Sequence, residues 1–429
     1  MNIIKLNITK LGRIRNSEVE ITPWVIISGE SGLGKSYLSI LIHYFFEILQ
    51  DTKRLNAFFE ERELDYNALR HTFRNDGTAF RIEKVDLERW MALDAIQYVK
   101  YMIKDDSLDA DIRVELPEAV ESEIICSYEE EASELNNDVE TYIKLTLSGL
   151  TYRLKNVPQG LGEESHFAFF LRYYLRKWIL GDYKALERTF VLPPSRGTMM
   201  TENVVPITGL YQKFDADKKF LEGAKDNPTQ TSPEVVQMMR NIMEGKVHIV
   251  DGKQYVYTMS DIEMPLSAAA SSVRELALFE MLIDNINIKN NAILIEEPEA
   301  HLHPAKQRLM ADILCAMSME GVYMQITTHS DFLIRRLNEL VRLKVIEQEM
   351  SPVDFEKLKE KMKCVVLPNT ETLSAYVVEL KDDYSIVVRQ NIERGVPYKS
   401  FLQPIKESVD FKNLLDLYEE KVKNNISEN

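Results

Sequence analysis

Two short stretches of the chain contain residue types that suit nucleotide chemistry. The first is rich in glycine and ends in a lysine and a serine: Gly29-Glu30-Ser31-Gly32-Leu33-Gly34-Lys35-Ser36. Glycines let the backbone bend until successive N–H groups point inward and cradle phosphate oxygens. A β-branched run precedes these residues and an apolar helix follows, which is the setting that a phosphate-binding loop requires. The sequence therefore predicts that Lys35 contacts the β- and γ-phosphates of ATP and that Ser36 ligates Mg²⁺.

The second stretch is the apolar run 291–295, which leads into Glu296 and Glu297. A short apolar run that ends in acids is typical of a buried parallel strand delivering carboxylates at its C-terminal end. We expect Glu296 to hold Mg²⁺ through water and Glu297 to polarise the attacking water.

Two further motifs flank the paired acids. A serine-rich turn and helix, residues 266–283, precede them, and a β-branched strand ending in His329 follows. This order of phosphate loop, serine-rich turn, paired acids and histidine resembles the ABC ATPases. The long separation between Lys35 and Glu297 agrees, since the corresponding sites lie much closer in AAA+ and small-GTPase folds.

The resemblance narrows to one branch of that superfamily. Segments 192–197, 296–304 and 327–330 look like those of ATPases related to the overcoming-lysogenisation-defect (OLD) family. That group includes the ATPase subunits of bacterial anti-phage systems of the Septu, PARIS and Gabija types. The resemblance covers residues 1–50 and 187–336, about half of the chain, and does not single out one defence system.

The resemblance implies roles for two more residues. Ser272 corresponds to the signature serine, which touches the γ-phosphate bound by the partner subunit. His329 corresponds to the residue that senses the γ-phosphate and positions water. Val273 and Arg274 stand where glycines are usual, so the chain departs from the family pattern there.

The resemblance also implies partners. One is a second copy of the chain, in a homodimer or higher homo-oligomer that closes head to tail around ATP. Another is a separate effector, a nuclease or toxin, that the ATPase controls. OLD nucleases add a Toprim domain with a strand-end Asp-x-Asp, but downstream of His329 the adjacent Asp382 and Asp383 are not spaced in that way. We therefore expect no built-in Toprim nuclease.

The elements that must position these residues predict an α/β fold. We expect an ABC-type P-loop NTPase head, a mixed β-sheet with flanking helices, split between residues 1–50 and 186–345. Residues 51–185 mix helical and β-rich stretches without a nucleotide motif, and we interpret them as an inserted α+β lobe. Residues 346–429 are predicted to form a small C-terminal α/β extension.

The predicted extension contains two strands, 375–380 and 385–390, and a helix over 411–423 that leads into a polar tail. At the N-terminus, residues 2–8 alternate apolar and polar side chains and predict a strand rather than a secretory signal.

Composition is that of a globular protein, with 45% hydrophobic and 28% charged residues. No apolar run approaches the roughly 20 residues that cross a bilayer, so we expect no membrane contact and a cytoplasmic location. The net charge of −16 argues against indiscriminate binding to phosphate backbones, although a local basic groove is compatible with it. The three cysteines are far apart and predict buried thiols.

Nucleic acid is a further candidate partner. Basic and aromatic residues are interleaved in one stretch: Arg172, Tyr173, Tyr174, Arg176, Lys177, Trp178, Tyr183, Lys184 and Arg188. Such a stretch can grip nucleic acid by charge and stacking, but a solvated face of an amphipathic helix has the same pattern. The alternative function is a DNA repair or recombination ATPase of the RecF-like type. A transporter subunit is disfavoured, because the chain has no LSGGQ.

Two smaller questions concern ligands. The pair His301 and His303 invites a zinc site, but the turn after the acids already accounts for both. Arg13, Arg15 and Trp24 are candidates for contact with adenine, and their spacing does not choose among them.

Overall fold

The fold is that of a computed structural model. It describes residues 2–62, 80–135, 138–155, 166–182, 184–202, 204–224, 231–250, 254–392, 406–416 and 418. Within these ranges no helix is both long and apolar enough to cross a membrane.

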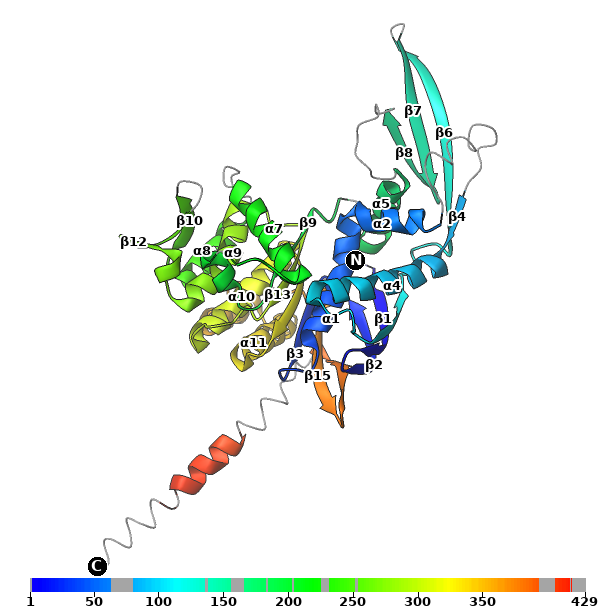
Figure 1. The fold of residues 1–429 in the computed structure, drawn as a ribbon. Helices are drawn as coiled ribbons and strands as arrows, with labels where there is room; N and C mark the ends of the chain where they lie inside the picture. Colours follow the sequence, from blue (N-terminus) through cyan, green and yellow to red (C-terminus); the bar gives the residue numbers. More distant parts are fainter. Residues whose placement is uncertain are drawn as a thin grey trace, which may run out of the picture.

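A nine-stranded mixed sheet forms the centre of the molecule (Figure 1). In sheet order the strands are β5 (Ala110–Glu115), β1 (Ile4–Leu11), β2 (Ile14–Ile21), β16 (Tyr384–Arg389), β15 (Leu373–Lys381), β3 (Trp24–Gly29), β14 (Tyr323–Thr328), β13 (Asn291–Glu296) and β9 (Arg188–Leu192). β1 pairs antiparallel with both β2 and β5, and β15 pairs antiparallel with β16. The strands β15, β3, β14, β13 and β9 form a parallel block.

The strands of the parallel block are buried on both faces, as their apolar sequences predict. Every residue of β3, β13 and β14 is buried. Successive side chains of a strand point to opposite faces, so Val25 and Ile27 enter one core while Trp24 and Ile26 enter the other. The prediction of a buried parallel strand that ends at Glu296 is confirmed.

Helices cover both faces of the sheet (Figure 1). The core that contains Val25 also contains apolar side chains of α1 (Lys35–Gln50), α2 (Thr52–Glu60), α4 (Lys84–Ile103) and α5 (His166–Leu180). The core that contains Ile26 is built with α6 (Arg196–Thr201), α7 (Gly209–Gly223), α8 (Pro233–Met243), α9 (Ser271–Asn285), α10 (Pro304–Met319), α11 (Asp331–Glu347) and α12 (Pro352–Met362).

Two smaller antiparallel sheets flank the main body. One consists of β4 (Phe80–Glu83), β6 (Glu123–Leu135), β7 (Asp138–Leu147) and β8 (Leu150–Lys155), and its long β6–β7 hairpin projects from the body in Figure 1. The other consists of β10 (Lys246–Val250), β11 (Gln254–Met259) and β12 (Ile262–Pro265). Short 3₁₀ turns, η1 (Leu266–Ala268) and η2 (Thr370–Thr372), precede α9 and β15.

The central sheet draws strands from all three predicted parts of the chain. β5 comes from the stretch interpreted as an inserted lobe, and β15 and β16 come from the predicted C-terminal extension. The division into a split head, a lobe at 51–185 and an extension at 346–429 stays a prediction, but its boundaries do not separate the strands of this sheet. Residues 406–416 are helical, which includes the first part of the helix predicted over 411–423. Residues 419–423 of that prediction and the polar tail lie outside the described residues.

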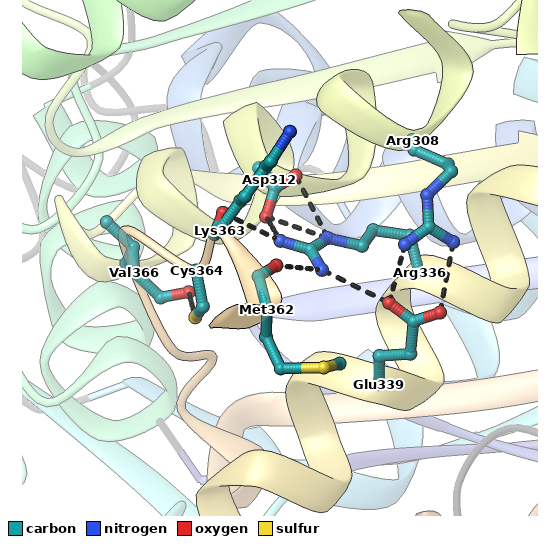
Figure 2. A network of polar contacts seen from close by, with 8 residues as sticks. All are labelled: Arg308, Asp312, Arg336, Glu339, Met362, Lys363, Cys364 and Val366. Atoms are coloured by element: carbon teal, nitrogen blue, oxygen red, sulfur yellow. Dashed lines mark hydrogen bonds and ion pairs between the residues drawn. The ribbon is translucent and has the colours of Figure 1, made fainter. Parts of the chain in front are cut away.

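A buried guanidinium joins α10 and α11 to the end of α12 (Figure 2). Arg336 donates to both carboxylate oxygens of Asp312 at 2.9 to 3.1 Å and to Glu339 at 3.1 Å. It also donates to the carbonyl oxygens of Met362 and Lys363, at 3.0 and 3.1 Å. Because the chain continues from α12 to β15, this network fixes the approach to the strand that pairs with β3.

Candidate functional site

The glycine-rich loop joins β3 to α1 and has the backbone that its sequence predicts. Gly29, Gly32 and Gly34 have φ angles of 135°, 76° and 102°, where a side chain would be strained. At Gly29 the space is closed as well, because a Cβ there would lie 2.4 Å from the carbonyl oxygen of Val378 on β15. The loop leads into the N-terminus of α1, whose free N–H groups and partial positive charge favour an anion.

Lys35 is the first residue of α1, and its side chain reaches back into this loop. Its ammonium group donates to the carbonyl oxygens of Gly29 and Glu30 at 2.9 and 2.6 Å. Burial lowers the pKa of Lys35 to about 8, against the opposing effect of nearby carboxylates, of which Glu297 acts most strongly. The charge is therefore held in place but poorly solvated, a state that a bound phosphate would relieve.

Glu296 ends β13 and meets the phosphate loop through Ser36. The parallel register places Glu296 beside Thr327 on β14. The side chain is buried, its pKa is raised by that burial, and the Ser36 hydroxyl donates a hydrogen bond to it. Its Oε1 atom has no hydrogen-bond partner. A buried carboxylate with an unpartnered oxygen beside a hydroxyl fits a hard divalent cation such as Mg²⁺.

Glu297 and His329 face each other from the ends of neighbouring strands. The His329 Nε2 atom lies 3.5 Å from Glu297 Oε1, and both side chains are partly exposed. Glu297 has a left-handed backbone, with φ of 48°, and its N–H donates to the carbonyl oxygen of Thr327. Strained backbone of this kind costs about 1–3 kcal/mol and clusters at functional sites.

The environment of His329 favours the neutral ring. Burial lowers the pKa of His329, the charge of Lys35 lowers it further, and Glu297 opposes both. At neutral pH the imidazole can therefore donate one hydrogen bond and accept another.

Glu299 organises the backbone before His329, a role that sequence reasoning missed. Its buried Oε1 atom accepts from Thr328 Oγ1 at 2.7 Å and from the His329 N–H at 2.8 Å. The signal in the sequence is an acid two residues after Glu297, beyond a proline. Its partner strand lies about thirty residues further along, so the contact becomes visible only in the fold.

Lys35, Ser36, Glu297 and His329 line one cavity of about 590 Å³, a size typical of small-ligand sites. Loop residues, Glu297, Thr327 and His329 line its phosphate end. The other end is lined by residues of the β1–β2 turn, α1 and the α4–β5 loop: Gly12, Arg13, Tyr37, Asp105, Ser107, Leu108 and Asp109. Thus the structure brings together Lys35, Ser36, Glu297 and His329, with Glu296 buried directly beneath.

The α4–β5 loop was not identified from the sequence, because it falls in the predicted inserted lobe. It is tied to the β1–β2 turn by a hydrogen bond from the Gly12 N–H to the Asp109 carbonyl oxygen, 3.0 Å long. The proximity of two loops almost a hundred residues apart follows from the pairing of β1 with β5, for which these sequences carry no local signal.

The three candidates for adenine contact have different positions. Arg13 is exposed and lines the cavity. Arg15 instead donates to the carbonyl oxygens of Gly12 and Ile14. Trp24 was a wrong candidate, because it is only 1% exposed and lies at the opposite end of β3 from the phosphate loop.

Ser272 is not among the residues that line the cavity. It is partly exposed in the first turn of α9. His303 serves as the N-cap of α10, with its Nδ1 atom accepting from the Ala305 N–H at 3.4 Å. Among the described residues, no group of three or more His, Cys, Asp or Glu side chains could hold a metal ion.

The basic and aromatic stretch along α5 packs against α1. Arg172 and Arg176 donate to the carbonyl oxygens of Gln50 and Leu49 at the C-terminal end of α1, where cations are favoured. Tyr174 is buried, and the Arg188 guanidinium lies 3.6 Å from the ring centroid of Phe220. These contacts give Arg172, Tyr174, Arg176 and Arg188 a structural role. Tyr183 lies outside the described residues.

Comparisons with known proteins agree with the site. Residues 205–334 match a family model described as an AAA ATPase domain. No protein of curated function matches the chain. The family match covers Glu296, Glu297 and His329 but not the phosphate loop, and together with that loop it supports an ATP-binding ATPase domain.

Solved structures that align with the chain include heads of SMC proteins. One, bound to the C-terminal winged-helix domain of ScpA, has a TM-score of 0.39 and 12% identity, covering 92% of this chain and 99% of the other. The SMC head domain from Thermotoga maritima has a TM-score of 0.34 and 11% identity, over 91% and 100%. A head with an extended coiled coil, derived from Pyrococcus furiosus and bound to the C-terminal domain of ScpA, has a TM-score of 0.36 and 11% identity. The alignment covers 94% of this chain and 99% of the other. These TM-scores are low, so the α/β P-loop fold is assigned from strand order and loop geometry.

Proposed function

We propose that the chain hydrolyses ATP in the cavity between the phosphate loop and the paired acids, and that a second copy of the chain completes each site. One observation carries the hydrolytic part. The strands β3, β14 and β13 are parallel neighbours, and their C-terminal ends bring Lys35, His329 and Glu297 to one cavity.

Each group in the cavity has a chemistry that matches a step. Lys35 and the loop N–H groups bind the β- and γ-phosphates. Ser36 and Glu296 hold Mg²⁺, which when bound neutralises charge on the phosphate oxygens. Glu297 orients and polarises the attacking water. The neutral His329 donates its single N–H toward the γ-phosphate, and its other ring nitrogen is free to accept a hydrogen bond from the attacking water.

The position of Ser272 supports the second copy. The serine stands outside the cavity of its own chain, which supports the role that the family resemblance gives it, contact with ATP held by another subunit. A head-to-tail homodimer with two shared sites results, and dimer state and nucleotide state become one equilibrium.

Kinetics test this part of the proposal directly. Specific ATPase activity is expected to rise with protein concentration, because the active site assembles from two chains. Lys35→Ala is expected to abolish nucleotide binding, whereas Lys357→Ala, an exposed lysine of α12, serves as the matched control. Specific activity that does not change with concentration would exclude a site shared between weakly associated chains.

The biological role we propose is that of the ATPase and sensor subunit of a bacterial anti-phage complex, which controls a separate effector. The resemblance to OLD-related ATPases supports it. The RecF-like alternative, direct binding of DNA, is less favoured because Arg172 and Arg176 are engaged with α1.

Purification of the tagged chain from its own cells tests this role. A nuclease or toxin is expected to copurify and to change activity with nucleotide state. Tight DNA binding with a steep salt dependence and no companion protein would favour the alternative.

A further inference from the structure

A fully buried arginine joins the helix that carries Ser272 to the strand that carries the paired acids. Arg196 begins α6 and is 0% exposed. Its Nε atom donates to the carbonyl oxygen of Glu275 at 2.7 Å. Its Nη1 atom donates to the carbonyl oxygen of Glu296 at 2.8 Å and to that of Pro193 at 3.0 Å.

The hydrogen bonds to Glu275 and Glu296 connect Arg196 to two different parts of the proposed ATP sites. Glu275 lies on α9 three residues after Ser272, so both belong to the first turns of one helix. The Glu296 carbonyl belongs to the peptide group that immediately precedes Glu297, where the backbone is left-handed. The plane of that peptide helps to set the direction of the Glu297 side chain. One rigid guanidinium therefore spans from the first turns of α9 to the peptide that orients Glu297.

The contact also has unused hydrogen-bonding capacity. The Nη2 atom of Arg196 and the Oε2 atom of Glu275 are both buried and have no partner. Unsatisfied buried groups are costly, and a charged donor and acceptor on neighbouring residues gain by pairing. A shift of α9 relative to α6 that let them pair would give a second arrangement, which suits the contact to two states.

The packing between α6 and α9 is close enough to transmit such a shift. A Cβ on Gly197 would come within 3.0 Å of Glu275 Oε1 and 3.1 Å of Arg274 Cβ. The first turns of α6 and α9 are thus in contact next to the arginine, and interiors packed in this way transmit strain.

We infer that Arg196 is a positioning residue that couples the two ATP sites of the dimer: engagement of a chain's Ser272 with the partner's ATP is transmitted through Arg196 to the peptide that aims the same chain's Glu297. This inference rests on the proposed head-to-tail dimer. It adds that hydrolysis at one site depends on occupancy of the other, because each chain contributes its acids to one site and its serine to the other.

The test isolates the path by using a chain that has no nucleotide of its own. A ¹⁵N-labelled Lys35→Ala chain is mixed with excess unlabelled Glu297→Gln chain, ATP and Mg²⁺, and mass spectrometry follows amide hydrogen exchange in the heavy chain only. Exchange at residues 295–297 of the heavy chain is expected to slow severalfold, although its own loop is empty. The effect is expected to vanish when the heavy chain also carries Arg196→Lys.

Matched controls separate coupling from loss of stability. Arg336→Lys removes another buried guanidinium that also holds backbone carbonyls but touches neither α9 nor β13, and it is expected to keep the exchange effect. Gly197→Ala, which leaves the guanidinium intact, is a second probe and is expected to weaken the effect. Persistence of slowed exchange with Arg196→Lys, or its absence in the parent mixed dimer, overturns the inference.

Steady-state kinetics give a second readout. The native chain is expected to show a Hill coefficient above 1 for ATP, and Arg196→Lys to reduce it to 1 with ATP affinity changed less than about threefold. A merely structural role would lower the rate and leave the Hill coefficient unchanged. A coefficient of 1 in the native chain also overturns the coupling. If a mass measurement shows that the mixed dimer does not form, both the inference and the proposed function are contradicted.

Discussion

At the scale of single residues, the Lys35 ammonium is buried near the carboxylates of Glu296 and Glu297, where water would normally separate such charges. Burial lowers the pKa of Lys35 and raises that of Glu296, so each charge is held at a cost in solvation free energy. Phosphates and a divalent cation carry the charges that offset this cost. These burial effects suit the proposed ligand, Mg²⁺–ATP, which carries charges of both signs.

Glu297→Gln tests the proposed role of this carboxylate. Glutamine keeps the shape of the side chain but cannot accept a proton, so turnover is expected to fall by about 10²–10⁴-fold, the usual contribution of a general base. ATP affinity is expected to be retained, because Lys35 and the loop bind the phosphates. Phosphate release and equilibrium binding measure the two quantities, and an unchanged rate would refute the assignment.

The pKa of Lys35 predicts a proton linkage. In the free protein this pKa is about 8, and bound phosphates raise it, so ATP binding takes up a proton between the two values. Affinity is expected to fall as pH rises through 8, by about tenfold between pH 7 and pH 9. Calorimetric titrations at pH 8.5 in buffers of different ionisation enthalpy measure the uptake. Equal heats in all buffers would contradict this linkage.

At the scale of elements, the Arg336 network determines how α12 is held against α10 and α11 (Figure 2). Arg336→Met leaves the buried Asp312 carboxylate and two backbone carbonyls without their donor. Removing one member of a buried pair costs about 3–5 kcal/mol, so the free energy of unfolding is expected to fall by that amount in urea denaturation. Adding Asp312→Leu is expected to restore part of it. A loss below about 1 kcal/mol would show that the network is solvated.

Local pattern predicted the elements that carry the chemistry, because their signals are short. The β-branched run before Gly29 and the apolar run before Glu296 each indicate a buried strand without knowledge of its neighbours. Sheet order could not be predicted in the same way. The insertion of β15 between β3 and β16 depends on pairing between residues more than three hundred positions apart.

For the basic and aromatic stretch that begins on α5, the sequence pattern could not predict which partner its side chains contact. Its charge and aromatic content suit both nucleic acid and solvent, yet Arg172 and Arg176 bind the last carbonyls of α1. The C-terminal end of a helix carries about half a negative charge and so also attracts cations. Sequence pattern records the charge of a side chain but not the partner that the fold provides.

At the scale of the whole molecule, the proposed function requires two chains that share each nucleotide. The cavity of one chain is lined by the phosphate loop, Glu297 and His329, whereas Ser272 lies on α9 outside that lining. Ligand binding that requires two chains makes association depend on ATP.

The most direct test of this central claim is the solution mass of Glu297→Gln measured by light scattering, with and without ATP and Mg²⁺. The account predicts that the mass doubles on addition of ATP and that adding Ser272→Arg, which places a bulky side chain at the shared site, keeps the protein at its nucleotide-free mass. A mass that does not respond to ATP, or that doubles regardless of Ser272→Arg, would contradict a site completed by Ser272 of a second copy.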